Sequence, residues 1–225
     1  MKKTATNSFS QSGFSILELI IAMSLTLVIM GIASTFLAAS FKIRNRENHR
    51  SSALADAQRA LNSMTREIAN AGYGLSSNGI VTGGDSGANQ IRVRSDLDLS
   101  GATNGVGEDL KYLLVKDTNG SFIVRMNLQP TQATGLIANR IDELAIYYYD
   151  CRVTYTIGNG LISNVRNSAG AVQAEVTPDK AKYVVLLIRV TLDAVGVAGS
   201  PGYHPASTTQ LASSVTLRNT DLPNY

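Results

Sequence analysis

The sequence is poor in the residues from which small proteins build covalent or metal cross-links. It has one cysteine, Cys151, two histidines, His49 and His204, and no tryptophan. A single cysteine cannot form an internal disulfide, and this set cannot supply the four ligands of a structural zinc site. Charged residues are also few, at 16%, while 44% of residues are hydrophobic, a balance that excludes a disordered chain. The 225 residues must therefore be stabilised by packing, and they suffice for one medium domain with a core.

The excess of positive over negative charge is confined to the beginning of the chain. The first 50 residues hold six lysines and arginines against Glu18 and Glu47, a net charge of +4. Because the whole chain has a net charge of +3, residues 51–225 sum to −1. A protein that binds nucleic acid through its folded part needs a basic surface there, so this distribution argues against nucleic acid as a partner.

A run of 28 residues from Phe14 to Phe41 contains a single charged residue, Glu18. About 20 apolar residues in a helix cross the hydrocarbon core of a bilayer, so the run predicts a transmembrane helix. A cleaved secretory signal is the alternative, because it also combines a basic start with an apolar region and small residues, here residues 38–40. Its apolar region is only about 7–15 residues long, which favours the transmembrane helix.

Glu18 is the anomaly of this run, because an unpaired carboxylate at hydrocarbon depth is costly and intramembrane ionisable groups are functional by default. No lysine or arginine lies three or four residues away, so a partner has to come from elsewhere. The alternative is that Glu18 lies in the headgroup zone and extends towards water.

The junction Ser12-Gly13-Phe14-Ser15-Ile16-Leu17-Glu18-Leu19 closely resembles the processing site of type IV prepilins. The resemblance implies that a membrane-embedded prepilin peptidase cuts after Gly13 on the cytoplasmic face and methylates the new terminal Phe14. It also supplies the missing partner, since the Phe14 ammonium of a neighbouring subunit can pair with Glu18 when subunits pack.

The charge pattern around the run predicts the opposite orientation. Lys42, Arg44, Arg46 and Arg50 follow it directly, whereas Lys2 and Lys3 alone precede it. The positive-inside tendency would place the more basic side in the cytoplasm, while the prepilin resemblance requires the reverse. We favour the orientation implied by the junction, because the junction combines several residue constraints and the charge rule is a bias.

Apolar residues recur at helical spacing beyond the run. They are Leu54, Ala57, Leu61, Met64, Ile68 and Ala71. Their spacing predicts that the helix continues with one apolar face to residue 71, where Gly72 can stop it. We expect this face to pack on a sheet of the same chain, with a coiled-coil partner as the alternative. The predicted divisions are a leader (1–13), a transmembrane half-helix (14–41), an amphipathic half-helix (42–71) and a β-rich head (72–225).

Beyond Gly74 the helical period disappears, and short apolar runs between turn residues predict strands. The predicted strands are 90–95, 110–116, 122–128, 141–149, 152–157, 161–166, 183–192 and 211–218. Residues 183–192 are apolar on both faces, which predicts a central strand. Turn sequences at 117–120 and 158–160 predict two hairpins, and residues 76–89 and 194–208 predict loops. The expected fold class is α+β: a long amino-terminal helix packed on an antiparallel β-sheet head, which is pilin-like.

Segments 60–68, 71–73 and 215–219 resemble PilW-like minor pilins, and nearly as closely the J-type minor pseudopilin of type II secretion. Major pilins usually close the head with a disulfide, which a single Cys151 cannot form. The resemblance implies a minor pilin that takes part in type IV pilus assembly, in the initiating or tip complex. The alternatives are a minor pseudopilin of a type II secretion system, and a membrane-tethered adhesin or DNA-uptake module.

The resemblance also implies partners and a location. The partners are other pilins and minor pilins, bound through the amino-terminal helix, together with the prepilin peptidase and the inner membrane. The protein is expected to cross the bacterial inner membrane once with its head in the periplasm, and later to enter a pilus at the cell surface. No small-molecule substrate and no cofactor are expected.

Other candidate sites are weak. Asp96 and Asp98 begin a calcium-loop pattern, but Glu108 comes one residue too late for it, so a plain turn is the expectation. No base accompanies a serine or cysteine, so we expect no enzyme. The tyrosines at 147–149 are expected to pack in the fold because no basic groove accompanies them. Cys151 is expected to be a small buried hydrophobe.

Overall fold

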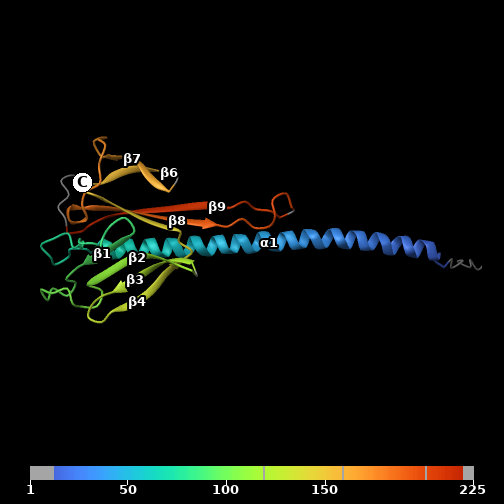
Figure 1. Ribbon diagram of the computed structural model, residues 1–225, viewed down its shortest axis with the longest axis horizontal. Coiled ribbons are helices and arrows are strands. Elements are labelled where there is room, and N and C mark those ends of the chain that lie inside the picture. The colour runs from blue at the N-terminus through green and yellow to red at the C-terminus, as the bar shows by residue number, and fades with distance from the viewer. Residues whose placement is uncertain (1–12, 119, 159, 201, 220–225) are drawn as a thin grey trace, which may run out of the picture. The chain divides into compact units, whose positions relative to one another are not determined.

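The computed structural model describes residues 13–118, 120–158, 160–200 and 202–219, and Figure 1 shows their helix and strands. The leader residues 1–12 lie outside the described residues. The chain divides into two units, which are described separately: Met1–Arg46 with Val195–His204, and Glu47–Ala194 with Pro205–Tyr225. The elements are helix α1 (Ile16–Ile68), a short 3-10 turn (Pro178–Lys180), and strands β1 (Gln90–Arg94), β2 (Asp109–Asp117), β3 (Gly120–Asn127), β4 (Ala133–Asn139), β5 (Glu143–Tyr149), β6 (Val153–Gly158), β7 (Leu161–Asn167), β8 (Tyr183–Leu192) and β9 (Ser207–Thr216).

The helix α1 is continuous over 53 residues, as the absence of proline before Pro130 allows. It ends at Ile68, three residues before the predicted end, and the turn that follows contains Gly72 at a φ of 78°. A Cβ on Gly72 would lie 2.5 Å from the carbonyl oxygen of Ser77. Both the left-handed backbone and this close approach require glycine here, as the predicted helix stop assumes.

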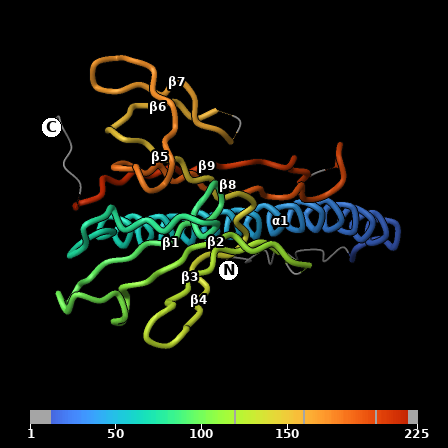
Figure 2. The backbone as a smooth tube through the Cα atoms, turned by 60° about the vertical axis from the view of Figure 1, so that its left-hand side comes forward, coloured from blue at the N-terminus to red at the C-terminus, as the bar shows by residue number. Residues whose placement is uncertain are grey.

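Three antiparallel sheets make up the β-rich part of the second unit. They have the strand orders β1-β2-β3-β4, β5-β8-β9 and β6-β7. Figures 1 and 2 show β8 and β9 running along one side of the second half of α1 and β1–β4 along the other. The α+β class with a long helix on antiparallel sheets is confirmed, although three sheets replace the predicted single one.

Most predicted strands are confirmed to within two residues, and β8 has the predicted bounds. Both predicted hairpins form, because β2 pairs with β3 and β6 pairs with β7. Two predictions were incomplete. The strand β4 was missed, since its seven residues, ATGLIAN, have no apolar alternation, and its pairing with β3 is interrupted by a register shift. The strand β9 begins at Ser207, whereas the predicted strand begins at Leu211. Its first four residues are polar and none is buried, so the apolar pattern did not include them.

The predicted apolar face of the helix forms the centre of the main core. Ala57, Leu61, Met64 and Ile68 are buried, whereas Leu54 is only half-buried. They pack with side chains from both larger sheets, among them Ile91 and Tyr112 of β1 and β2, and Ile146, Leu186 and Ile188 of β5 and β8. The face therefore packs on sheets of its own chain, as expected, and the coiled-coil partner is not needed to bury it.

A second apolar cluster covers the opposite face of β5 and β8. Tyr149, Tyr183 and Val185 pack there under the β6–β7 hairpin, with Tyr147 and Cys151 partly buried beside them. Tyr148 points the other way into the main core. In Figure 2 the hairpin lies beyond β5 and β8, on the side away from α1. The strand β8 is thus buried on both faces, which confirms it as the central strand of its sheet.

Charged groups tie the helix and a loop to the first sheet. Glu67 of α1 accepts a hydrogen bond from the Tyr112 hydroxyl and forms an ion pair with Arg125 of β3, at 2.9 Å. Burial, followed by the Glu67 carboxylate, raises the pKa of Tyr112 well above its ordinary value. Since Glu67 is itself only partly exposed, this contact fixes the rotation of the helix against the sheet.

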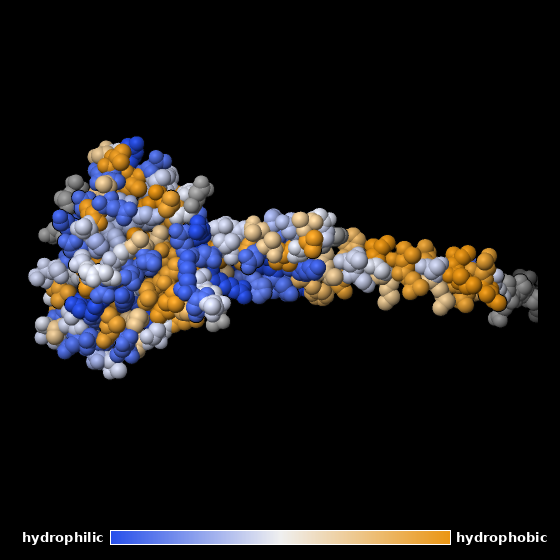
Figure 3. Space-filling view, in the orientation of Figure 1, coloured by the Kyte–Doolittle hydropathy of each residue, from blue (hydrophilic) through white to orange (hydrophobic). Residues whose placement is uncertain are grey.

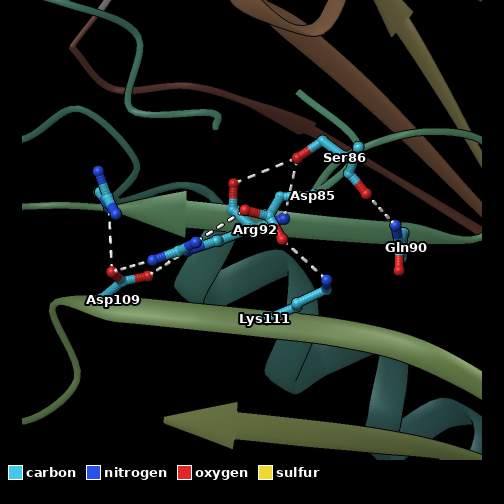
Figure 4. A network of polar contacts seen from close by, with 8 residues as sticks. Asp85, Ser86, Gln90, Arg92, Asp109 and Lys111 are labelled. Carbon is cyan, nitrogen blue, oxygen red and sulfur yellow. Dashed lines mark hydrogen bonds and ion pairs between the residues drawn. The ribbon is translucent and has the colours of Figure 1, made fainter. Parts of the chain in front are cut away.

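A network of five charged residues holds the loop before β1 (Figure 4). The Arg92 guanidinium forms two hydrogen bonds with Asp109, at 2.8 and 2.7 Å, and one with Asp85 at 2.7 Å. Lys111 bonds the other oxygen of Asp85 at 2.9 Å, and Arg94 bonds Asp109 at 3.0 Å. Asp109 is almost fully buried, so its negative charge depends on these cations.

These contacts predict an acid-sensitive contribution to stability. Burial acts to raise the pKa of Asp109, but the hydrogen bonds and charges of Arg92 and Arg94 outweigh it, so this pKa is lowered. Hydrogen bonds from Lys111 and Arg92 lower the pKa of Asp85. The stabilisation is therefore complete above the unfolded pKa of about 3.9 and is lost as the pH falls through the lower folded values.

Asp109→Asn should lower the unfolding free energy by about 1–3 kcal/mol at pH 7, because charge-assisted hydrogen bonds are lost. The difference from the wild type should shrink below about pH 4. Urea unfolding of the full chain in detergent, followed by near-ultraviolet circular dichroism between pH 2 and pH 7, measures both. A difference that stays constant down to pH 2 would show that the network does not act through the Asp109 charge.

Candidate functional site

The predicted site residues lie together where the helix α1 begins. The helix starts at Ile16, and the Ser15 hydroxyl accepts a hydrogen bond from the backbone N–H of Leu17 at 3.3 Å. A serine before the first helical residue commonly satisfies a free N–H in this way. Phe14, immediately before it, is 84% exposed. The described part of the junction, residues 13–15, is thus an accessible segment outside any helix or strand that leads directly into a helix.

The described residues leave open space around position 13. A Cβ built on Gly13 would meet no described atom within 4 Å. Gly72, in contrast, is fixed by both its φ and its close contacts. Crowding by the described residues therefore does not restrict position 13 to glycine.

The first part of α1 is apolar on all sides and carries its side chains on the outside. The most apolar stretch of 18 residues in the helix has a mean hydropathy of 2.4, and none of that stretch is buried. Figure 3 shows apolar residues along the visible face of this segment. Among the described residues, α1 is the one helix long and apolar enough to cross a membrane. The exposed side chains include Ile16, Leu19, Ile20, Met23, Leu25, Leu27, Val28, Met30, Ile32, Phe36 and Leu37.

Hydroxyl groups within this apolar segment bond to the helix itself. Ser24, Thr26, Ser34 and Thr35 each donate to a backbone carbonyl three or four residues earlier, at 2.7 to 2.9 Å. A polar group in hydrocarbon needs such an internal partner because no water is available. These four residues are therefore compatible with a lipid environment without help from other chains.

Glu18 is the exception in this segment. It is exposed, lies in the first turn of α1, and forms no ion pair with any cation in the described part of the chain. The free N–H groups of a helix start favour a negative charge at this place, but by only about 0.3–1 kcal/mol near a water-exposed surface. That is less than the cost of burying a carboxylate. Glu18 therefore remains available for a cation from outside the chain.

The basic residues that follow the apolar run differ in their exposure to solvent. Lys42 and Arg44 are exposed, whereas Arg46 is buried. His49 contacts the Arg140 guanidinium at 3.2 Å. Exposed cations directly after an apolar helix are suited to anionic lipid headgroups.

The acidic residues of the calcium-like pattern come together, but as part of a loop. Asp96, Asp98 and Glu108 each place an oxygen within 4.8 Å of the others. The late position of Glu108 in the sequence thus does not keep it away from the aspartates, because the loop folds back. Its two oxygens accept backbone N–H groups of Leu97 at 2.8 Å and of Gly105 at 2.6 Å. This arrangement organises the turn that the sequence predicts, and a cation could use only the remaining lone pairs.

The remaining candidates are components of the packing. Tyr148 and Tyr149 are buried, and burial raises the pKa of Tyr149 to about 12. Cys151 is half-buried in the second apolar cluster, and burial raises the pKa of its thiol, which reduces its reactivity. Four arginines of the strands, Arg92, Arg94, Arg125 and Arg189, are paired with acids.

The sequence reasoning missed one contact in the first unit. The loop between β8 and β9 reaches α1 at Ala39, where a Cβ on Gly202 would lie 3.2 Å from the Ala39 Cβ. Ala39 is consequently half-buried within a segment that is otherwise exposed. The signal was present only as a stretch of small and uncharged residues, which indicates a loop but not what the loop touches.

Residues 8–34 match the family model described as the prokaryotic N-terminal methylation motif. The match includes Gly13, Phe14 and Glu18 and supports a type IV prepilin-like protein with a membrane anchor that crosses once. Prepilin-like proteins are structural subunits and not catalysts. No curated protein and no solved structure matches the chain.

The exposed apolar surface of α1 predicts stable membrane insertion. Leu25 and Val28 lie in the middle of the segment and are 61% and 59% exposed. Changing both to arginine should oppose insertion by about 5–7 kcal/mol, because each arginine near the centre costs about 2.5–3.5 kcal/mol. Carbonate extraction of membranes should release much of this double variant and leave the matched Leu25→Ala, Val28→Ala variant in the pellet. Equal retention of both variants would contradict a lipid-embedded position for these residues.

Proposed function

We propose that the protein is a minor pilin, a non-enzymatic subunit that a prepilin peptidase cuts after Gly13 and that enters a type IV pilus through α1. The observation that carries this proposal is the exposed Gly13-Phe14 junction, placed directly before a helix whose first half is apolar on every side. The match of residues 8–34 to the methylation motif supports it. The new terminus would be Phe14, which the same peptidase methylates.

Glu18 has a role in assembly under this proposal. Cleavage creates an ammonium group on Phe14, four residues before Glu18, at the start of the apolar segment. In a bundle of such helices, the Phe14 ammonium of one subunit pairs with the Glu18 carboxylate of its neighbour. Each charge then satisfies the other, which compensates for the desolvation that both suffer in an apolar environment. The pairing also fixes the axial register between neighbouring subunits, since it joins one defined atom pair.

The same architecture serves a minor pseudopilin of a type II secretion system, and the residues of this chain do not distinguish the two. The proposal for a pilus rests on the resemblance of the helix end and the last strand to PilW-like minor pilins. Crosslinking in cells, followed by identification of the bound subunits, separates the two assemblies. Pilins among the partners would support the pilus, and secretion pseudopilins would replace it with the alternative.

A head that binds DNA directly has less support. Residues 51–225 sum to a charge of −1, and Arg92, Arg94, Arg125 and Arg189 are paired with carboxylates inside the head. A DNA groove needs unpaired cations that track the phosphates. We therefore propose that the head is an assembly component, and we place it in the periplasm because the prepilin resemblance implies that orientation.

Cleavage after Gly13 predicts a defined mature chain. Mass spectrometry of the protein extracted from membranes should show a first residue of Phe14 carrying a methyl group. Gly13→Leu should block the cut, because the active site of the peptidase has to accommodate the new side chain. The described residues of the chain itself leave space for it, so no change in folding is expected. Gly31→Leu is the matched control, since Gly31 also has no described atom near its Cβ and should be processed normally. An intact Met1 terminus in the presence of an active peptidase would exclude the proposal.

The pairing role of Glu18 predicts a loss of assembly without a loss of folding. Glu18→Leu should be inserted, cut and as stable as the wild type, because Glu18 is exposed and belongs to the first unit, outside the packed core of the second. Its incorporation into pili should fall by about a hundred-fold or more, since leaving one partner of a buried pair uncompensated costs about 3–5 kcal/mol. Glu47→Leu, on the same helix but beyond the apolar run, is the control. Counting tagged subunits in sheared pili measures the incorporation of both variants. Normal incorporation of Glu18→Leu would contradict the pairing role and favour the alternative, in which Glu18 lies in the headgroup zone.

A further inference from the structure

The loop that joins β8 to β9 has a defined structure of its own. Val195 and His204 exchange two backbone hydrogen bonds of 2.9 Å across its base. Within the loop, the N–H of Ser200 donates to the carbonyl of Val197 at 3.0 Å, and the N–H of Tyr203 donates to the carbonyl of Ser200 at 3.1 Å. We refer to residues Val195–Ser200 and Gly202–His204 as the β8–β9 loop. These bonds hold the backbone of the loop in a closed form.

The β8–β9 loop is attached to the apolar part of α1. Gly202 has a φ of 80°, and a Cβ there would lie 3.2 Å from the Cβ and 3.3 Å from the Cα of Ala39. Such a distance means that the loop backbone rests directly on the helix, which two small residues permit. Ala39 is half-buried for this reason, while its neighbours Ala38 and Ser40 are exposed. The position of the loop along the membrane normal is therefore set by the position of Ala39.

A bilayer centred on the apolar run would have its edge near Ala39. The apolar run from Phe14 to Phe41 has 28 residues, whereas about 20 helical residues cross the hydrocarbon core. Centring the core on the run places its far edge near residue 37, so Ala39 lies just beyond it, at the depth of the headgroups. Lys42 and Arg44 follow within about 8 Å along the helix, at a rise of 1.5 Å per residue, and are exposed.

The composition of the loop suits that depth. From Ala194 to Leu217 the sequence contains no lysine, arginine, aspartate or glutamate. Val197 is 76% exposed at the tip, and Tyr203 is half-buried beside Gly202. Tyrosine is enriched where membrane meets water, and an uncharged loop with an exposed valine can enter the headgroup layer without desolvating a charge.

We propose that the β8–β9 loop is a second membrane contact, which lays Val197 and Tyr203 into the phospholipid headgroup layer on the far side of the bilayer from Phe14. This contact makes the membrane-held subunit bind lipid at two places in the sequence, the helix and a loop more than 150 residues later. It rests on α1 crossing the bilayer, and not on cleavage at Gly13 or on the pairing of Glu18. Withdrawal of the loop from lipid would accompany extraction of the subunit from the membrane.

Depth-dependent fluorescence quenching tests the proposal. The full chain, with Cys151 changed to Ser and Val197 to Cys, is labelled with an environment-sensitive fluorophore and reconstituted in phosphatidylethanolamine–phosphatidylglycerol vesicles. Lipids that carry a spin label at the headgroup or shallow acyl positions should quench this probe several-fold more than a probe at Val106→Cys. Val106 is the matched control, because it is a valine of a second-unit loop with 77% exposure.

Further measurements decide whether the loop contacts lipid or a second copy of the chain. Gly202→Val should abolish the difference in quenching while the protein stays in the membrane, because a Cβ clashes with Ala39 and the positive φ disfavours valine. Equal quenching of the Val197 and Val106 probes by lipid would overturn the proposal. Protection of the Val197 probe only at high protein-to-lipid ratio would also overturn it, because the occupant would then be a second copy of the chain.

Discussion

A carboxylate at the start of an apolar helix is the constraint on which the account of this protein depends. The segment around Glu18 has no buried surface and no described cation for it, while the four hydroxyls of the same segment bond to their own helix. Hydrocarbon tolerates the hydroxyls but not an unpaired charge. Glu18 is therefore stable in lipid only at its edge or beside a cation from another molecule. Under the proposed function, a cut after Gly13 would create such a cation at Phe14 and would link processing to assembly through one electrostatic requirement.

The two halves of α1 differ in how their apolar side chains are buried. In the second half, one face packs between two sheets, and Glu67 and Thr65 bond to β2, β3 and β9 on either side. In the first half, every side is apolar and almost nothing within the chain covers it. Only lipid or the same segment of other subunits can bury that surface. The core of the second unit and the exposed apolar surface of the first are therefore built from separate residues.

Periodicity in the sequence predicts those parts of the fold in which burial follows a regular pattern. The strand β8 was predicted with its observed bounds because both of its faces are covered, and Tyr147 to Tyr149 alternate between two clusters as a strand requires. The strand β4 and the start of β9 were missed, since they lie at sheet edges and have few buried side chains, Ala138 being the one fully buried residue of β4. In the candidate site, the junction could be recognised from the sequence, because its pattern consists of consecutive residues. The approach of Glu108 to Asp96 and of Gly202 to Ala39 was not, because both depend on how loops fold back.

The distance between Phe14 of one subunit and Glu18 of the next tests the central claim most directly. Filaments assembled from a mixture of subunits, one labelled with ¹⁵N at Phe14 and the other with ¹³C at the Glu18 carboxyl, allow this distance to be measured by solid-state magnetic resonance. The account predicts a contact between differently labelled subunits that corresponds to an ion pair, with nitrogen and oxygen within about 4 Å. Absence of that contact in filaments that contain both labelled subunits would show that Glu18 is satisfied in some other way.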